Sequence, residues 1–439
     1  MTRRVLLSLL IGSVAGVLIL HGFAPFESAA ALWHLFASLL QEAWILKTLA
    51  FAVLVGSIMT LLSASGGVAG FVHYVRERRA LVRSQRSALL LTYGIGVLIF
   101  IESSITSMIA GTVGRPLTDA YGVSRAKLAY VCDATSAPVC SLIVFNGWGA
   151  LLLGLIAVQT ESGLIEGNSV TWLLEALPYN FYALAALGVA FLTVWYGIDI
   201  GPMRRAAVVH EPEESVAGGK MGFMLWPIGL LLALVFAVLW LTGGGNLLEG
   251  SGSTALFYAT ALTVLFCIVY YRAVGGMPVR EGALHAYRGA KSMVGIAAIL
   301  LFAFAISEVT KELETGLYIA SFSKNSIAPQ WIGGIVFLLA AVMAFATGTS
   351  WGTFSIMIPI AVPLAVGLDA DVALCIGAVI SGGVFGDHCS PISDTTIISS
   401  MAARCDHIEH VKTQLPYALI SGGIALACFW LTGWLTGSA

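Results

Sequence analysis

The sequence predicts an all-α, polytopic membrane protein of about ten to twelve transmembrane helices, with inverted repeats, broken helices and re-entrant hairpins. Three observations lead to this fold class. Of the 439 residues, 58% are hydrophobic and 10% are charged, whereas soluble domains carry about 25% charged residues. Apolar runs long enough to cross a bilayer recur along the chain. Two further apolar stretches are interrupted by glycine, proline, aspartate and serine, as in helices that break inside a membrane.

The composition also excludes several functional classes. A net charge of −2 provides no basic footprint for a nucleic acid. The seven cysteines are odd in number and include no C-x-x-C pair, so we expect neither a disulfide framework nor a zinc site. The sequence has no G-x-x-x-x-G-K-[ST] motif, which argues against a pump that carries its own ATP-driven motor.

The first helix is expected at residues 1–20, where two arginines precede an apolar run; a signal peptide is the alternative interpretation. Further runs of spanning length occur at 44–70, 88–111, 171–196, 223–242, 253–271, 292–309, 331–348 and 416–436. The two interrupted stretches are 112–159 and 349–400.

Basic residues predict the orientation of these spans. They gather at the N-terminus and in three expected loops, 71–87, 198–220 and 272–291, and such loops lie in the cytoplasm. The path between the first two loops therefore crosses the membrane an even number of times. Because 88–111 and 171–196 are clear spans, the stretch 112–159 must return to the side that it left, as a re-entrant hairpin with a further element would do. The helices at 88–111 and 331–348 then run in opposite directions.

Those two helices lead into similar sequences. Each contains a Gly-Thr pair (at 111–112 and 348–349), then a proline, then an aspartate followed within a few residues by serine and proline. We therefore expect N-terminal transmembrane helices over 1–70 and a first inverted repeat over 71–197, with a hairpin around Asp133. Cytoplasmic loops and linking helices follow over 198–291, and a second inverted repeat over 292–439 has its hairpin around Asp387. Interrupted helices in corresponding places indicate the binding site of a secondary transporter.

Carboxylates in apolar segments are the first candidates for that site, because a charge in the bilayer core is costly. Glu102 shares one helix face with Ser103, Thr106 and Ser107. Hydrogen bonding between helices is the alternative role for these hydroxyls. Glu308 lies at a helix end, where an interfacial position is expected.

A second group of candidates surrounds Asp387 and Asp394. Pro391 lies between them and pushes the preceding residue toward extended geometry, so the helix must open there. Opened backbone, hydroxyls and carboxylates supply the oxygen ligands that suit a hard cation such as Na⁺. Capping of the next helix is the alternative role for Asp394. Asp133 stands in the corresponding place of the first half, and His388 is either a proton relay or a bystander.

Two enzyme motifs are matched only superficially. Gly348-Thr349-Ser350-Trp351-Gly352 fits G-x-S-x-G, but that nucleophile turn follows a strand, whereas here it joins two apolar helices. An intramembrane aspartyl protease would need a catalytic pair of aspartates. Asp387 and Asp133 could supply such a pair, so this protease is kept as a remote alternative. The run His407 to His410 is not H-E-x-x-H, so a zinc protease is unsupported.

The motifs after residue 347 resemble the NhaC family of Na⁺/H⁺ antiporters. The similar runs are Gly348 to Pro359 and Gly386-Asp387-His388-Cys389-Ser390-Pro391-Ile392-Ser393-Asp394-Thr395-Thr396, together with Glu102-Ser103-Ser104 and Asp133 to Pro138. The resemblance covers about residues 85 to 410. It implies Na⁺-linked secondary transport and inverted repeats whose hairpins meet at the centre. Members of the family are described both as Na⁺/H⁺ antiporters and as carriers of organic solutes, including malate–lactate exchangers.

We therefore expect a multi-pass antiporter of the cytoplasmic (inner) membrane, with its N-terminus in the cytoplasm, that exchanges Na⁺ or Li⁺ for H⁺. It is expected to be neither an enzyme nor dependent on a cofactor, with membrane lipid as its surroundings and homodimerisation left open. Asp387, Asp133 and Glu102 would hold Na⁺ or H⁺ in turn. Further oxygens would come from Ser103, Thr135, Ser136, Thr349, Ser350, Ser390 and Asp394. The main alternative is a Na⁺-coupled or exchange carrier of a small dicarboxylate, monocarboxylate or amino acid.

Overall fold

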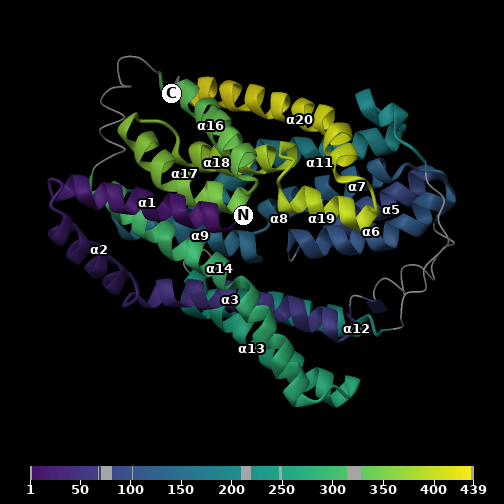
Figure 1. The fold of residues 1–439 in the computed structure, drawn as a ribbon, viewed down its shortest axis with the longest axis horizontal. Helices are drawn as coiled ribbons and strands as arrows, with labels where there is room; N and C mark the ends of the chain where they lie inside the picture. The colour runs from purple at the N-terminus through teal and green to yellow at the C-terminus, as the bar shows by residue number, and fades with distance from the viewer. Residues whose placement is uncertain are drawn as a thin grey trace.

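The computed structural model describes residues 2–67, 69–70, 82–100, 102–208, 219–246, 250–313 and 328–436. Within these ranges every regular element is a helix, and ten helical segments are long and apolar enough to cross a membrane. Figure 1 shows the whole bundle. The predicted fold class, an all-α polytopic membrane protein, is therefore confirmed.

The helices differ widely in length, and many are short. In chain order they are α1 (Thr2–Leu20), α2 (Pro25–Leu39), α3 (Ala43–Ala64), α5 (Gln85–Leu98), α6 (Ser103–Ala120), α7 (Arg125–Ala134), α8 (Ala137–Leu142), α9 (Gly147–Glu161), α10 (Ser169–Ala176), η2 (Leu177–Tyr179), α11 (Phe181–Tyr196), η3 (Gly201–Arg205), α12 (Gly222–Thr242), α13 (Gly252–Gly275), α14 (Val279–Glu312), η5 (Pro329–Trp331), α16 (Ile332–Thr347), α17 (Ser350–Gly367), α18 (Val372–Cys389), α19 (Asp394–Ala403) and α20 (His407–Thr436).

Several expected spans have different bounds. The run 88–111 is not one helix, because α5 ends at Leu98 and α6 begins at Ser103. The run 171–196 is divided by η2, which contains a proline. Most of the expected loop 272–291 is helical, because α14 begins at Val279 and continues through the apolar run to Glu312. Residues 71–81 and 209–218, which carry much of the two other expected loops, lie outside the described residues.

The structure contains an internal repeat with a constant offset. α5, α6 and α7 begin at residues 85, 103 and 125, and α16, α17 and α18 begin 247 residues later, at 332, 350 and 372. The ends of α8 and α18 and the starts of α9 and α19 keep the same offset. The second copy has one long helix, α18, where the first has α7 and α8. The order α5–α6–α7–α8–α9 is thus repeated as α16–α17–α18–α19.

The two copies use the same kind of signal at matching positions. In each copy the chain leaves the helix between the first and second helices (α5 and α6, or α16 and α17), and we call this interruption a break. The helix that starts after the break is capped by a side chain, and the turn that ends this helix contains a residue in the left-handed region. The caps are Glu102 and Thr349, and the turn residues are Gly122 (φ 70°) and Asp369 (φ 53°). Side-chain caps satisfy backbone N–H groups that a helix start leaves unpaired. These capped breaks fix where each helix begins.

The structural repeat pairs different residues of the two copies from those that the sequence motifs had paired. Thr349 corresponds to Glu102, not to Thr112, and Asp387 corresponds to Cys140, seven residues beyond Asp133. The predicted pairing aligned similar Asp, Ser and Pro runs, whereas helix breaks and caps determine the structural alignment. The opposite direction of the two copies in the membrane and the predicted domain boundaries stay predictions.

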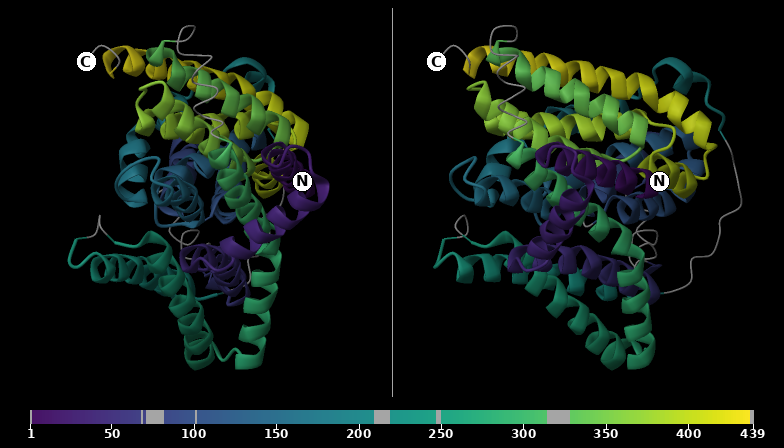
Figure 2. Two further views of the ribbon diagram at one scale, coloured as in Figure 1. Left: turned by 90° about the vertical axis from the view of Figure 1, so that its left-hand side faces the viewer. Right: turned by 60° about the vertical axis from the view of Figure 1, so that its left-hand side comes forward.

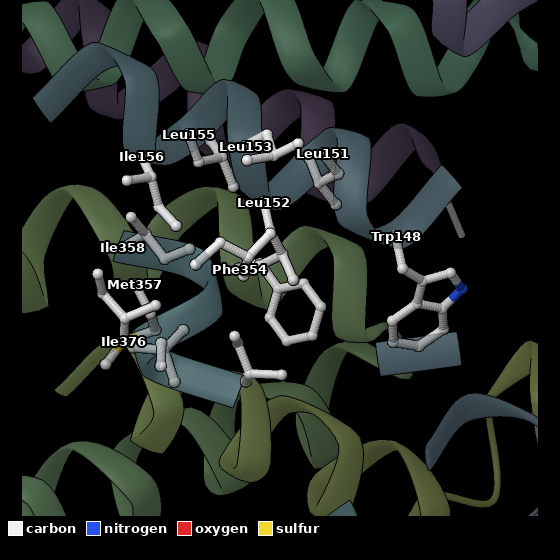
Figure 3. Packing of buried hydrophobic residues seen from close by; sticks show 14 of the residues in the cluster. Trp148, Leu151, Leu152, Leu153, Leu155, Ile156, Phe354, Met357, Ile358 and Ile376 are labelled. Carbon is white, nitrogen blue, oxygen red and sulfur yellow. The ribbon is translucent and has the colours of Figure 1, made fainter. Parts of the chain in front are cut away.

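The two copies interlock at the centre of the molecule. α19 of the second copy packs against α6 and α7 of the first, while α9 of the first packs against α17. Figure 3 shows this second contact, with Leu152 and Ile156 of α9 facing Phe354 and Ile358 of α17. α12, α13 and the first part of α14 lie on one side, away from α16, α18 and α20 (Figures 1 and 2). The breaks of both copies are thereby buried together.

Candidate functional site

A cavity of about 280 Å³ lies where the helix breaks of the two copies meet. Its polar lining comes from the break before α6 (Glu102, Ser103), from the break before α17 (Thr349, Ser350), and from Asp387, Asp394 and Thr395. Apolar residues of α3, α9 and α14 complete the lining, including Trp148 and, from α17, Trp351. Sequence-predicted residues from both repeats are thus brought to one cavity.

Three carboxylates line this cavity: Glu102, Asp387 and Asp394. Among the described residues of the lining there is no lysine, arginine or histidine. Buried charges are usually paired or bind a cation, because their desolvation is unfavourable. When these carboxylates are ionised, the wall of the cavity has no basic side chain, among its described residues, to balance their charge.

Asp387 is the most deeply buried of the three carboxylates, with 1% of its surface exposed. It lies in the last turn of α18, which ends at Cys389, and the extended Ser390 before Pro391 makes that end, as predicted. Thr395 Oγ1 donates a hydrogen bond to Asp387 Oδ2 at 3.2 Å. Asp387 Oδ1 is buried without a hydrogen-bond partner, so one oxygen is available for a ligand.

Glu102 has a different local role from the one predicted. It does not lie on one face of a continuous helix but caps the start of α6, where Oε2 accepts from the backbone N–H of Ile105 at 2.9 Å. Oε1 accepts from the hydroxyls of Ser104 at 2.9 Å and Ser103 at 3.3 Å. The break in the chain, and not helical spacing, brings this carboxylate to the cavity.

Asp394 is the first residue of α19, and the cap of that helix is Ser393, whose hydroxyl accepts from the N–H groups of Thr395 and Thr396. The expected alternative, that Asp394 itself is the cap, is therefore wrong. Asp394 is exposed, Glu102 is half-buried and Asp387 is buried, so the three carboxylates differ in their access to water. Two hydroxyls from the other break, those of Thr349 and Ser350, lie on the same lining.

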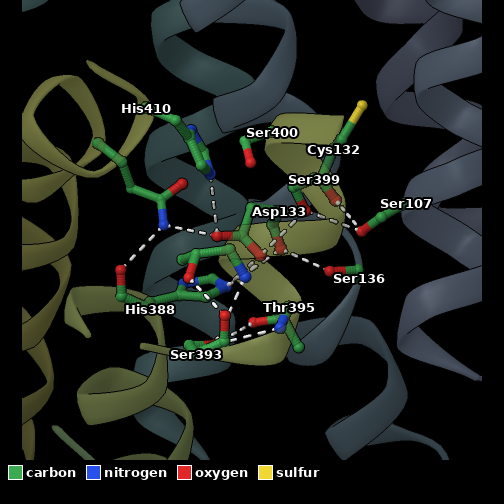
Figure 4. A network of polar contacts seen from close by, with 12 residues as sticks. Ser107, Cys132, Asp133, Ser136, His388, Ser393, Thr395, Ser399, Ser400 and His410 are labelled. Atoms are coloured by element: carbon green, nitrogen blue, oxygen red, sulfur yellow. Dashed lines mark hydrogen bonds and ion pairs between the residues drawn. The ribbon is translucent and has the colours of Figure 1, made fainter. Parts of the chain in front are cut away.

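Asp133 does not line the cavity. It is fully buried near the end of α7, where Oδ1 accepts from Ser399 Oγ at 3.2 Å and Oδ2 accepts from Gln414 Nε2 at 2.6 Å. Nε2 of His410 lies 3.4 Å from Oδ2. Figure 4 shows this second polar cluster, to which α7, α18, α19 and α20 contribute. The structure thus separates Asp133 from the carboxylates with which it was grouped.

The remaining predicted residues also lie outside the cavity lining. Thr135 Oγ1 donates to the carbonyl of Val131 and Ser136 Oγ to that of Asp133, in the break between α7 and α8. Ser390 Oγ donates to the carbonyl of Phe345 at 2.8 Å. These hydroxyls satisfy carbonyls near the breaks. Within the described residues, no three His, Cys, Asp or Glu side chains form a group suited to a metal ion.

Sequence reasoning missed several residues of both clusters. Gly147 and Trp148 line the cavity at the positions that correspond to Asp394 and Thr395 in the second copy. Asn146 caps α9 as Ser393 caps α19. His410 and Gln414 lie in the same buried cluster as Asp133 but more than 270 residues later in the chain. An alignment of the two halves at the 247-residue offset, in which capping residues such as Asn146 and Ser393 coincide, could have identified Asn146, Gly147 and Trp148 from sequence.

Comparison with known proteins agrees with this architecture. An uncharacterised protein of Haemophilus influenzae is 33% identical over 450 residues, covering 95% of this chain and 85% of its own. The malate-2H⁺/Na⁺-lactate antiporter of Bacillus subtilis is 34% identical over 113 residues, 25% of this chain and 24% of its own. The structure of the Neisseria gonorrhoeae antimetabolite efflux pump MtrF has the same fold, with a TM-score of 0.64 and 14% identity over 98% of this chain and 94% of that one.

The model of the Na⁺/H⁺ antiporter family matches residues 139–434. That range contains the second copy of the repeat, with Thr349, Asp387 and Asp394, and the part of the first copy from α8 onward. Together with the ten described helical segments that are long and apolar enough to cross a membrane, it identifies a multi-pass secondary transporter rather than an enzyme, which rules out the remote protease alternative. The chain belongs to the Na⁺/H⁺ antiporter family.

Proposed function

We propose that this protein exchanges Na⁺, or Li⁺ in its place, for H⁺ across the cytoplasmic membrane. The observation that carries the proposal is the cavity with three carboxylates and, among its described lining residues, no basic side chain. Oxygen ligands of this kind suit a hard cation. Asp387 is the proposed main ligand of the cation. Glu102 and Asp394 are proposed to bind it in turn within the same cavity, because no three acidic side chains of the described residues are grouped to hold one ion together. Hydroxyls of Ser103, Thr349 and Ser350 lie beside them. Asp133, which lies outside this lining, is not one of the proposed ligands.

The burial of Asp387 supports exchange rather than uncoupled leak. A bare carboxylate in a dry site is unfavourable, so the cavity is expected to change its access with a cation or protons bound, and not while it is empty and charged. The unpartnered Oδ1 is the atom at which the cation would bind. Exchange follows because each change of access needs a bound ion.

The proposal also includes an orientation. Arginines at the N-terminus and around the start of α14 favour a cytoplasmic location of both segments under the positive-inside rule. The N-terminus would then lie in the cytoplasm. Protease protection of a tag at residue 1 in right-side-out and inverted vesicles tests this; cleavage in right-side-out vesicles would contradict it.

Reconstituted liposomes with an internal pH-sensitive dye test the proposed exchange. Addition of Na⁺ or Li⁺ alone, with membrane potential clamped, should change internal pH within seconds, while K⁺ should not. If neither Na⁺ nor Li⁺ has an effect, but transport appears once an amino acid or a dicarboxylate is added, the proposal is wrong and the protein is an organic-solute carrier.

That second candidate is kept because of the size of the cavity. Its volume of about 280 Å³ approaches the lower end for small-molecule sites, about 300 Å³, and exceeds what a single cation needs. Trp148 and Trp351 lie edge to face in its wall, with ring centroids 6.2 Å apart. The similar Bacillus subtilis protein is named for malate, lactate, H⁺ and Na⁺. In this candidate the carboxylates hold the coupling ion beside the solute.

Glu102→Gln should separate helix capping from cation binding. The amide oxygen of glutamine can still accept from the N–H of Ile105, so helix α6 keeps its cap. The loss of one negative charge should raise the KM for Na⁺ about tenfold, which corresponds to about 1.4 kcal/mol. Measurement of ²²Na⁺ uptake against concentration gives the KM, with Glu175→Gln on the exposed side of α10 as the matched control. Equal KM values in the two variants would exclude Glu102 as a cation ligand.

A further inference from the structure

The buried cluster around Asp133 contains two histidines with different surroundings. His388 Nε2 lies 3.0 Å from the backbone carbonyl of Asp133, and its Nδ1 lies 3.0 Å from the hydroxyl of Tyr182. A carbonyl can only accept, so Nε2 of His388 carries a hydrogen. Both ring nitrogens of His388 are thus engaged in hydrogen bonds that position α18 beside α7 and α11. Of the two roles that the sequence left open for His388, this arrangement favours the bystander over the proton relay.

His410 is the opposite case. Its side chain is fully buried, and neither ring nitrogen has a hydrogen-bond partner. Its nearest charged neighbour is Asp133, with Nε2 3.4 Å from Oδ2. The carboxylate of Asp133 already accepts from two neutral donors, Ser399 and Gln414. A neutral His410 therefore leaves one negative charge in the cluster, and a protonated His410 balances it.

We propose that the Asp133–His410 pair is a proton-binding site of the transport cycle, outside the cation cavity and additional to the protons that the cavity carboxylates hold when no cation is bound. The inference rests on the proposed exchange of a cation for H⁺. A proton from water binds to Nε2 of His410, and the resulting N–H donates to Asp133 Oδ2. When the proton leaves, Asp133 keeps its hydrogen bonds from Ser399 and Gln414. The pair changes between zero and one negative charge, without any change in the ligands of the cation.

Helix α19 connects the two sites. Thr395 donates to Asp387 in the cavity, and Ser399, one turn later on the same helix face, donates to Asp133. Helix α18 makes a second connection, because Gln414 donates to the carbonyl of His388 at 2.9 Å, next to Asp387. A change of charge in the Asp133–His410 pair therefore acts on the two helices that hold Asp387 and Asp394.

Other titratable groups surround the pair. Cys132 of α7, His388 of α18 and Tyr182 of α11 face Asp133. Cys405, before α20, lies beside the backbone N–H of His410, and the carboxylates of Asp387 and Asp394 interact with Asp133 through space. A cation bound at either of those two carboxylates would disfavour a positive His410. The sign of this interaction is the one that exchange requires: cation binding favours proton release.

His410→Gln tests the inference, because it removes the titratable group and keeps a polar side chain. Two assays on proteoliposomes separate the sites: ²²Na⁺/Na⁺ exchange at equal pH needs only the cation cavity, whereas Na⁺-driven pH change needs both. We expect the variant to retain the first and to lose the second about tenfold or more, within the range of coupling between linked sites. His285→Gln, a histidine on α14 paired with Glu281, should retain both. Unchanged Na⁺-driven pH change in His410→Gln would overturn the proposal.

Ser399→Ala gives a second measurement if His410→Gln does not fold. It leaves both members of the pair in place but removes the hydroxyl that joins α19 to Asp133. The midpoint of the pH–activity profile should shift by about one unit, as expected for a tenfold change in proton affinity. An unshifted midpoint in this variant would also overturn the proposal. Absence of both assay signals in the wild-type protein would instead contradict the proposed function, so the two failures are distinguishable.

Discussion

Asp387→Asn should reduce Na⁺-dependent transport by on the order of 100-fold, equivalent to about 2.8 kcal/mol. The substitution keeps the shape of the side chain, and the amide oxygen can still accept from Thr395. It removes the one carboxylate of the cavity that is fully buried and has a free oxygen. A neutral amide cannot balance the charge of a bound cation, and it does not make the empty cavity energetically unfavourable as a bare carboxylate does. Both ²²Na⁺/Na⁺ exchange and Na⁺-driven pH change should therefore be lost together.

The matched control for this variant is Asp369→Asn. Asp369 is exposed in the turn between α17 and α18 and has a φ of 53°, a conformation that asparagine adopts readily. The same chemical change at this position should leave transport within twofold of wild type. Retention of more than half of the wild-type rate in Asp387→Asn would show that the cation binds elsewhere, with the Asp133 cluster as the next candidate.

Asp387→Asn is expected to lose both ²²Na⁺/Na⁺ exchange and Na⁺-driven pH change, whereas His410→Gln is expected to lose only the second. The contrast follows from position: Asp387 lines the cavity, whereas Asp133 and His410 lie outside it and are linked to it by hydrogen bonds through α18 and α19. If both variants lose the same activities to the same degree, cation and proton compete for one continuous site. Selective loss at His410 supports two linked sites.

The fold class and part of the site followed from sequence because their signals are local. Low charge content and apolar runs indicate membrane helices, and carboxylates in such runs are costly enough to stand out. Glu102, Asp387 and Asp394 were found in this way. The break at Pro391 was also predictable, since proline disfavours helix for the residue before it.

The rest depended on contacts between distant segments. The pairing of Asp133 with His410 and Gln414 joins α7 to α20, and no local pattern reports such a contact. The break before α6 was missed because residues 99–102 contain neither glycine nor proline, and Glu102 was placed in a helix that it in fact caps. One hydrogen-bond partner of this break, Asn146, lies 46 residues away, so sequence alone could not distinguish a polar helix face from a helix start.

Asn146 shows how such a break is held, and its replacement by aspartate should destabilise the protein strongly. Its Nδ2 donates to the carbonyls of Phe100, in the break before α6, and Cys140, each at 2.9 Å. Its Oδ1 accepts from the N–H groups that begin α9. Aspartate retains the acceptor and the cap but has no hydrogen to donate. Two buried carbonyls would then face a buried carboxylate.

The expected cost of Asn146→Asp is about 2–4 kcal/mol, from the unsatisfied acceptors alone. The matched control is Asn168→Asp: Asn168 is half-buried and caps α10 through its oxygen, and aspartate caps as well as asparagine does. Asn168 donates one longer hydrogen bond, to the carbonyl of Gly250 at 3.4 Å, where Asn146 donates two short ones. Thermal unfolding in detergent, followed by the loss of monodisperse protein, should show a clearly lower midpoint for Asn146→Asp and little change for Asn168→Asp. Because Phe100 lies two residues before Glu102, added Na⁺ should raise the midpoint less in Asn146→Asp than in wild type. Equal midpoints in the two variants would mean that the break before α6 is held by its own backbone and not by this amide.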